Sequence, residues 1–416
     1  MTTSSLAVFE RHESNVRSYC RSFPVVFERA QGCHLWDASG RRYVDLLCGA
    51  GALNYGHNPP EMVKRVVEYL TAGGPVHSLD LHTAAKAEFL ERFAEVILEP
   101  RGMGDFVVQF PGPAGTLAVE AALKLARKVT GRTRVISFTG GFHGASLGSL
   151  AATSAPLLRG AAGVELRDVT IVPYGDSEAA GDPAAALEEA VLRGAEPPAA
   201  ILLETVQGEG GLHAAPAAWL ARVRELADAA GALVIVDDIQ AGCGRTGTFF
   251  SFEDTPALNP DLVCLSKSLS GMGLPMAALL IRRDHDRWAP GEHNGTFRGH
   301  NLAFVAGSVA LDHWSDPDFT AHAAALAEAI RTGLDSITAM LPPHVARTVG
   351  KGAMSGLAFT DTADAARVQA SLFHDGVIAE TSGRGHVLKL LPPLTMSLPE
   401  WKETLDAIGN AVTPLR

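Results

Sequence analysis

Two short apolar segments of this chain each lead to a side chain that could take part in catalysis. Residues 233–236 are aliphatic and mostly β-branched, as in a buried strand of a parallel sheet, and Asp237 and Asp238 follow them directly. A second apolar run, residues 262–265, leads to Lys267, which stands among small residues. Ligands of α/β sheets bind at the carboxyl ends of the strands. We therefore expect an acid and an amine to face one crevice.

An acid and an amine in one crevice suit the chemistry of pyridoxal phosphate. The amine can form a Schiff base with the aldehyde of this cofactor, and the acid can keep its pyridine nitrogen protonated. An acid or a lysine alone at a strand end is more often a helix cap or a solvated loop residue. The prediction therefore depends on the pair occurring together with the motifs described next.

The motif Asp237-Asp-Ile-Gln240, with Lys267 and the segments below, resembles the class III, or omega, aminotransferases of fold type I. The resemblance covers nearly the whole chain. It implies that Asp237 pairs with the pyridine nitrogen, that Gln240 contacts the phenolic oxygen of the ring, and that Lys267 binds the cofactor covalently. Lys267 and Asp237 are thus the expected catalytic residues.

Three further segments resemble the cofactor-binding segments of this family. Gly115 and Thr116 begin an expected helix, whose free N–H groups and dipole favour a phosphate, although an alanine replaces the preceding serine of the family. Phe142 stands where the family stacks an aromatic ring on the pyridine, and His143 is expected to support that ring rather than to act as a base. Thr296 matches a threonine that reaches the phosphate of a neighbouring subunit. This match implies a homodimer or a larger homo-oligomer with shared active sites.

The expected substrate-binding residues depart from the family pattern. In many relatives the glutamate at the position of Glu209 pairs with a mobile arginine that also binds the α-carboxylate of the amino donor. Lys389 stands at the arginine's position here, and lysine lacks the two-pronged fork of arginine. Arg17, Tyr19 and Tyr55 are candidates for the substrate wall, although such residues are as often anchors of a subunit interface.

Segments 13–24, 49–58 and 77–81, together with the Asp-Asp-Ile-Gln motif, resemble one subfamily, the diaminobutyrate–2-oxoglutarate aminotransferases of ectoine, siderophore and antibiotic pathways. These enzymes move an amino group from glutamate to aspartate 4-semialdehyde, which gives 2,4-diaminobutyrate and 2-oxoglutarate. The small-molecule partners would then be an amino acid and a semialdehyde. A class III enzyme for ornithine, acetylornithine or 4-aminobutyrate would use the same cofactor chemistry and stays open as an alternative. A non-catalytic relative of these enzymes is disfavoured, because Asp237, Gln240 and Lys267 are all present.

The glycine pattern of residues 242–247 suggests a different function. It spells G-x-G-x-x-G after a strand, the fingerprint of a dinucleotide-binding site in an NAD-dependent oxidoreductase. That fingerprint must open a helix, whereas residues 248–252 are aromatic and β-like. We therefore keep the oxidoreductase as a remote alternative.

The bulk properties exclude other classes of function. A net charge of −11 over 416 residues, without a run of Lys or Arg, argues against a nucleic-acid partner. No apolar stretch reaches the length of a membrane span, and the first twelve residues do not resemble a signal peptide. The five scattered cysteines suggest reduced thiols in the cytoplasm, and no Cys or His spacing typical of a metal site occurs.

The order of the expected elements predicts an α/β fold. Strands and helices alternate from about residue 60 to 310, which is typical of a mostly parallel sheet covered on both faces. The expected strands are 106–110, 134–138, 169–172, 200–203, 232–236, 262–265 and 277–281, and the clearest helices are 116–130, 183–193 and 216–230. We expect an N-terminal arm that forms part of a small domain (1–60), a large cofactor-binding domain (61–314) and a C-terminal small α+β domain (315–416).

Overall fold

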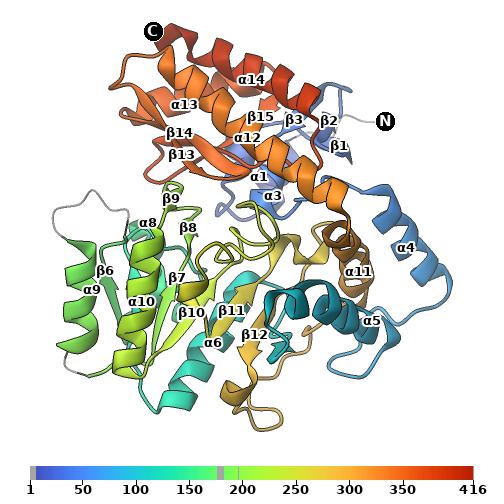
Figure 1. The fold of residues 1–416 in the computed structure, drawn as a ribbon. Helices are drawn as coiled ribbons and strands as arrows, with labels where there is room; N and C mark the ends of the chain where they lie inside the picture. Colours follow the sequence, from blue (N-terminus) through green and yellow to red (C-terminus); the bar gives the residue numbers. More distant parts are fainter. Residues whose placement is uncertain (1–5, 176–181, 195, 416) are drawn as a thin grey trace.

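A seven-stranded sheet forms the centre of the larger lobe of the molecule (Figure 1). The computed structural model describes residues 6–175, 182–194 and 196–415. The expectation that the first twelve residues are not a signal peptide falls partly on residues 1–5, which lie outside the described residues. The strand order is β4-β12-β11-β10-β7-β5-β6, and neighbours are parallel except around β12, which is antiparallel to β11 and to β4. The strands are β4 (Phe106–Gln109), β5 (Val135–Phe138), β6 (Val169–Val172), β7 (Ala200–Leu203), β10 (Leu233–Asp237), β11 (Leu262–Leu265) and β12 (Ala278–Arg282). The predicted mostly parallel α/β sheet is confirmed.

Helices cover both faces of this sheet because its strands are apolar on both sides. Leu233 and Ile235 of β10 pack in the core cluster that contains α6 (Gly115–Thr130), whereas Val234 and Val236 pack in the cluster that contains α10 (Ala217–Ala230). Successive side chains of a strand point to opposite faces. Asp237, the last residue of β10, therefore points to the same face as α6.

The smaller lobe is built around the antiparallel sheet β13-β14-β17-β16, and helices of the C-terminal segment pack against it (Figure 1). A second small sheet joins the two ends of the chain, because β15 pairs in parallel with β3 of the N-terminal segment. The elements are β1 (Phe27–Gln31), β2 (His34–Asp37), β3 (Arg42–Asp45), β13 (Ala346–Lys351), β14 (Met354–Phe359), β15 (Val377–Ile378), β16 (Glu380–Ser382), β17 (Val387–Leu390), α12 (Pro317–Ala339), α13 (Thr362–His374) and α14 (Leu398–Val412). The domain limits 60 and 314 stay predictions.

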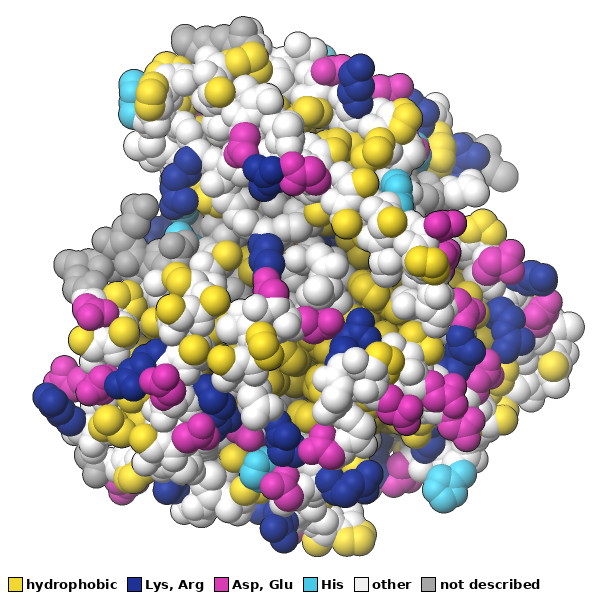
Figure 2. Space-filling model, in the orientation of Figure 1, with side chains coloured by type: hydrophobic (Ala, Val, Ile, Leu, Met, Phe, Trp, Pro, Cys, Tyr) yellow, Lys and Arg dark blue, Asp and Glu magenta, His cyan; other side chains and the backbone are white. Residues whose placement is uncertain are grey.

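The remaining elements are mostly short and connect these sheets. They are α1 (Ala7–His12), α2 (Tyr19–Ser22), α3 (Cys48–Gly51), α4 (Pro60–Thr71), α5 (Ala84–Phe93), α7 (Leu147–Ala152), α8 (Pro156–Gly160), α9 (Pro183–Leu192), α11 (Asn301–Ser315), β8 (Val206–Gln207), β9 (His213–Ala214) and single turns of 3-10 or π helix. Among the described helices, none combines the length and the apolar character that crossing a membrane requires. The face drawn in Figure 2 carries acidic and basic side chains that are interspersed rather than gathered by sign.

The expectation that residues 248–252 are β-like is wrong. These residues form turns and bends. The rings of Phe249, Phe250 and Phe252 are all buried in the core of the large lobe, and the first two pack edge to face. The aromatic residues that suggested a strand therefore serve core packing in an irregular segment.

Candidate active site

A cavity of about 280 Å³ lies at the carboxyl ends of the central strands. Its wall includes the residues that follow β10 and β11, the start of α6, and the turn after β5. The lining residues are Ala114, Gly115, Thr116, Phe142, His143, Gly144, Glu204, Glu209, Asp237, Ile239, Gln240, Ser266 and Lys267. Seven of the sequence-predicted cofactor residues thus share one cavity with Glu209, and Thr296 does not line it.

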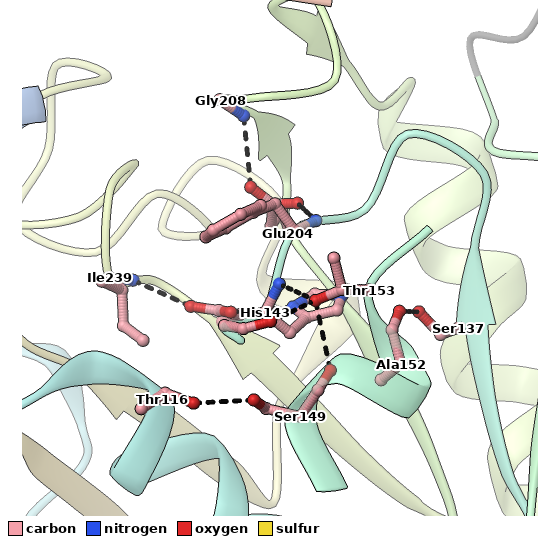
Figure 3. Close-up of polar contacts among 12 residues, drawn as sticks. Thr116, Ser137, His143, Ser149, Ala152, Thr153, Glu204, Gly208 and Ile239 are labelled. Atoms are coloured by element: carbon pink, nitrogen blue, oxygen red, sulfur yellow. Dashed lines mark hydrogen bonds and ion pairs between the residues drawn. The ribbon is translucent and has the colours of Figure 1, made fainter. Parts of the chain in front are cut away.

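The Asp237 carboxylate is held in place by two donors. Its Oδ2 lies 2.8 Å from Nδ1 of His143, and its Oδ1 accepts a hydrogen bond of 3.2 Å from the backbone N–H of Ile239. His143 is buried, and its own backbone N–H donates to Oγ1 of Thr153 (Figure 3). Burial alone would lower the pKa of His143, but the hydrogen bond and charge of Asp237 outweigh it and raise this pKa. The imidazole thus orients the acid.

Lys267 begins the turn that follows β11, beside the end of β10. The two strands are parallel neighbours, and Asp237 is in register with Cys264, three residues before Lys267. The backbone of Lys267 is left-handed, with φ +49°, a conformation that costs a non-glycine residue about 1–3 kcal/mol. Burial lowers the pKa of its ammonium, against the opposing charge of Glu209. The amine is therefore easier to deprotonate than an exposed lysine.

The start of α6 provides an end of the cavity suited to an anion. Ala114 caps this helix without a side-chain acceptor, so no side chain at the cap satisfies the first N–H groups of the helix. A Cβ on Gly115 would lie 3.0 Å from the Ile239 side chain, so a glycine lets the helix start approach that wall. Oγ1 of Thr116 lies 2.5 Å from Oγ of Ser146 and 2.6 Å from Oγ of Ser149. The hydroxyl is thereby fixed at the helix start, where a phosphate would bind.

Gln240 contributes a buried polar atom without a partner. Its Nε2 donates to the Ala50 carbonyl at 2.8 Å and to Oε1 of Glu209 at 3.3 Å. Its Oε1 receives no hydrogen bond from the described residues, although buried polar groups are rarely left unpaired. With an acid, an amine, the Phe142 ring and a helix N-terminus around it, this wall has the donor set that pyridoxal phosphate requires, and a polar group of a ligand would complete it.

Glu204 lines the cavity and was missed as a site residue in the sequence. Its carboxylate accepts hydrogen bonds from the backbone N–H groups of Phe142, at 3.0 Å, and Gly208, at 3.1 Å (Figure 3). Burial raises the pKa of Glu204 to about 7, although the charge of His143 acts in the opposite direction. Glu204 directly follows β7, so the strand-end rule that found Asp237 would have found it as well.

Three of the residues predicted to bind substrate lie together. Nζ of Lys389 is 2.7 Å from Oε1 of Glu209 and 2.8 Å from Oε1 of Glu380. Tyr19 reaches the same group from the N-terminal segment: burial, then the charges of Glu380 and Glu209, raise the pKa of its phenol to about 12. Glu380 carried no signal in the sequence, because its place opposite Lys389 is set by strand pairing.

The structure places the other predicted residues elsewhere. Tyr55 is buried, its hydroxyl accepts a hydrogen bond of 2.8 Å from Nε1 of Trp314, and its ring stacks on His313, so it belongs to a core rather than to the cavity wall. Arg17 packs within the N-terminal segment, 3.8 Å from Glu13. Thr296 lies on an exposed segment, where its carbonyl is 2.9 Å from Nε2 of His77.

The glycine pattern of residues 242–247 does not form a dinucleotide fingerprint. The segment from 242 to 255 is described completely and contains turns and bends, and the next helical residues are the 3-10 turn Pro256–Leu258. Arg245 within it is buried and donates to the carbonyls of Ala353 and Pro392 and to Asn54. The pattern therefore serves packing between the lobes, and the NAD-dependent alternative loses its structural basis.

One group with metal-ligating side chains lies outside the cavity, in the smaller lobe. Ligand atoms of Cys33, His34 and Glu400 fall within 4.8 Å of one another. Glu400 already serves the capping box of α14, in which its Oε2 accepts hydrogen bonds from Ser397. The absence of a metal cofactor stays a prediction.

The chain is similar to known aminotransferases over its full length. The family model described as aminotransferase class-III matches residues 16–412. A diaminobutyrate–2-oxoglutarate transaminase of Halalkalibacterium halodurans is 49% identical over 420 residues, which cover 100% of this chain and 98% of that one. A protein of the same name from Vibrio cholerae is 50% identical over 411 residues, covering 97% of this chain and 99% of its own.

Solved structures show the same similarity in three dimensions. An ornithine aminotransferase from Toxoplasma gondii superposes with a TM-score of 0.85 at 25% identity and covers 98% of this chain and 93% of its own. Another structure of that enzyme, described with partial occupancy of pyridoxal phosphate at the active site, gives a TM-score of 0.86 at 26% identity, with 99% and 94% covered. A transaminase from a marine Virgibacillus shares the fold, with a TM-score of 0.87 at 21% identity over 98% of both chains.

Proposed function

The chain belongs to the class III aminotransferases, and we propose that it moves an amino group from L-glutamate to L-aspartate 4-semialdehyde, giving L-2,4-diaminobutyrate and 2-oxoglutarate. The full-length similarity to transaminases of that name carries this assignment. The donor set of the cavity is consistent with it.

The reaction depends on pyridoxal phosphate, which supplies an aldehyde that takes up the amino group and a ring that stabilises negative charge on the reacting carbon. We propose that Asp237, oriented by His143, holds a proton at the pyridine nitrogen. Phe142 would lie against the ring, and the first N–H groups of α6 with Thr116 would hold the phosphate. Gln240 would meet the phenolic oxygen.

Lys267 has two proposed roles, as the covalent anchor of the cofactor and as the group that moves the proton. A general base must be neutral near the working pH, and burial of Lys267 lowers its pKa in that direction. Lys267 follows the end of β11 and lines the same cavity as Asp237. Loss of this amine should therefore affect the chemical step more than cofactor binding.

We further propose that the active sites are shared between two chains. The segment around Thr296 is exposed, and Phe297 beside it is 64% exposed, so both residues are accessible to a second chain. In a dimer, Thr296 would reach the phosphate in the partner's cavity. The five cysteines are free thiols in the structure, which supports the proposed cytoplasmic location.

The substrate is tested by comparing amino donors in the reverse direction. With 2-oxoglutarate as acceptor, 2,4-diaminobutyrate should give a higher kcat/KM than ornithine, acetylornithine or 4-aminobutyrate. Ornithine is the relevant competitor, because ornithine aminotransferases are among the structural neighbours. A higher kcat/KM for ornithine or 4-aminobutyrate would contradict the proposed substrate and leave the family assignment intact.

A further inference from the structure

In the cluster of Lys389, Glu209 and Glu380, two carboxylates surround one lysine ammonium. The Lys389 ammonium is fully buried and lies within 2.8 Å of both acids. Lys267 faces both acids as well. In the neutral form that its role as a base requires, Lys267 leaves two negative groups against the one positive group of Lys389, and the cluster then carries one excess negative charge. An excess charge this deep is compensated either by uptake of a proton or by a positively charged partner, and a ligand cation is one such partner.

The two acids are held in different ways. Glu380 of β16 lies directly opposite Lys389 of β17 in the antiparallel register, so sheet pairing fixes their ion pair. Glu209 comes from the connection between β8 and β9, and its backbone carbonyl accepts a hydrogen bond from the N–H of Gly383. Glu380 is therefore the fixed partner of the lysine, and Glu209 is the partner carried by a loop.

The two acids also differ in access to the cavity. The Glu209 side chain is 31% exposed and lines the cavity, whereas the Glu380 side chain is 5% exposed and does not line it. Among the described residues, Lys389 and Gln240 donate hydrogen bonds to the Glu209 carboxylate, and both end on Oε1. The second oxygen of Glu209 is thus an acceptor on the cavity side of the cluster that remains for a ligand.

We propose that Glu380 is a positioning residue that sets substrate specificity: it holds Lys389, so that Glu209 keeps an unneutralised charge for the α-ammonium of 2,4-diaminobutyrate. This inference rests on the proposed function. The α-ammonium of this substrate does not react, and it must find an anionic partner when the distal amine is at the cofactor. Glutamate carries no second ammonium, so the excess negative charge favours the diamine alone.

A pair of substrates isolates this interaction. 2,4-Diaminobutyrate and 4-aminobutyrate have the same carbon chain, carboxylate and reacting amine, and they differ in the α-ammonium alone. In Glu380→Gln holoenzyme the Lys389 charge would neutralise Glu209. A hydrogen bond to a charged group is worth about ten- to a hundredfold in affinity, so the kcat/KM advantage of diaminobutyrate over 4-aminobutyrate should fall by that factor. The glutamate half-reaction should be unchanged or faster.

Three controls separate this role from a structural one. Glu253→Gln, which removes a carboxylate paired with Arg101 at 2.8 Å, should leave the substrate ratio unchanged. Glu380→Asp, which keeps the charge, should retain most of the wild-type ratio. Dissociation constants of both amines, measured in a Lys267→Ala background, should show the same change without turnover.

The outcomes are distinguishable. Equal losses of Glu380→Gln on both amines, or an unchanged ratio, would overturn the role of Glu380 while leaving the proposed function in place. A wild-type enzyme without preference for diaminobutyrate would instead overturn the proposed function and the inference with it. If Glu380→Gln does not fold, Glu209→Gln carries the test, because it removes the charge itself from a partly exposed loop side chain. An undiminished diaminobutyrate advantage in that variant would also overturn the inference.

Discussion

Replacing Lys389 by methionine should separate the two halves of the transamination. The substitution keeps an unbranched side chain that is one atom shorter and removes the ammonium between Glu209 and Glu380. Glutamate must bring its α-carbon to the cofactor, so its α-carboxylate needs a cation nearby, and Lys389 is the cation beside the cavity acid Glu209. A charge-assisted hydrogen bond contributes about 1.5–3 kcal/mol, which corresponds to a loss of about 10- to 150-fold in kcat/KM.

The diaminobutyrate half-reaction should respond differently to the same change. Its α-ammonium would face two carboxylates without a competing lysine, so kcat/KM should stay within a few fold of wild type or rise. The folded state should become less stable by about 3 kcal/mol, the lower end of the cost of removing one partner from a buried ion pair, because Glu209 is partly exposed and can relax. Thermal unfolding of the holoenzyme measures this cost.

Each half-reaction can be followed as a single turnover by the visible absorbance of the cofactor. Lys128→Met, which removes an ammonium 2.7 Å from Glu292 on the surface, is the matched control and should leave both halves unchanged. Equal losses in both halves for Lys389→Met would refute the reasoning and make the lysine a structural residue. A loss confined to the diaminobutyrate half would reverse the assigned charge preference.

The remaining predictions concern the subunit arrangement and the pH dependence of stability. Mixing Thr296→Ala chains with Lys267→Ala chains should restore activity, since hybrid dimers would carry one site with both defects and one with neither; no recovery despite proven subunit exchange would argue that Thr296 serves its own chain. Burial raises the pKa of Asp238 in the folded protein to about 7, so the folded state binds a proton more tightly than the unfolded chain, and stability should fall as the pH rises from about 4 to 7. Asp238→Asn should remove up to about 4 kcal/mol of this fall in stability. The amide oxygen of the asparagine can still accept the hydrogen bond from the Ser251 N–H. If the melting temperature of this variant depends on pH as in the wild type, Asp238 is not the group responsible for the fall.

The large sheet could be predicted because its strands are buried on both faces and read as continuous apolar runs. Leu233 to Val236 and Leu262 to Leu265 are such runs, and the polar residues that follow them mark the carboxyl edge of the sheet. Chain direction then requires Asp237 and Lys267 to lie near each other. The same rule predicts Glu204, which directly follows β7.

Other parts of the site depend on contacts that the sequence does not encode locally. Glu380 faces Lys389 because of the register of β16 and β17, which a reading of single segments does not reveal. Tyr55 stands in a segment that resembles substrate-binding segments, yet its ring enters a core because Trp314 and His313 meet it from α11. The aromatic composition of residues 248–252 suggested a strand, whereas the three phenylalanine rings are buried in the core from a segment of turns and bends.

The most direct test of the central assignment is to locate the lysine that binds the cofactor. Purified enzyme loaded with pyridoxal phosphate should be yellow, and reduction with borohydride should leave the cofactor attached, after proteolysis, to the peptide that contains Lys267. Lys267→Ala should still bind the cofactor, lose the stable attachment on reduction, and lose about a hundred- to ten-thousandfold in turnover. Recovery of the label on any other lysine, Lys389 included, or stable attachment in the Lys267→Ala variant, would contradict the assignment.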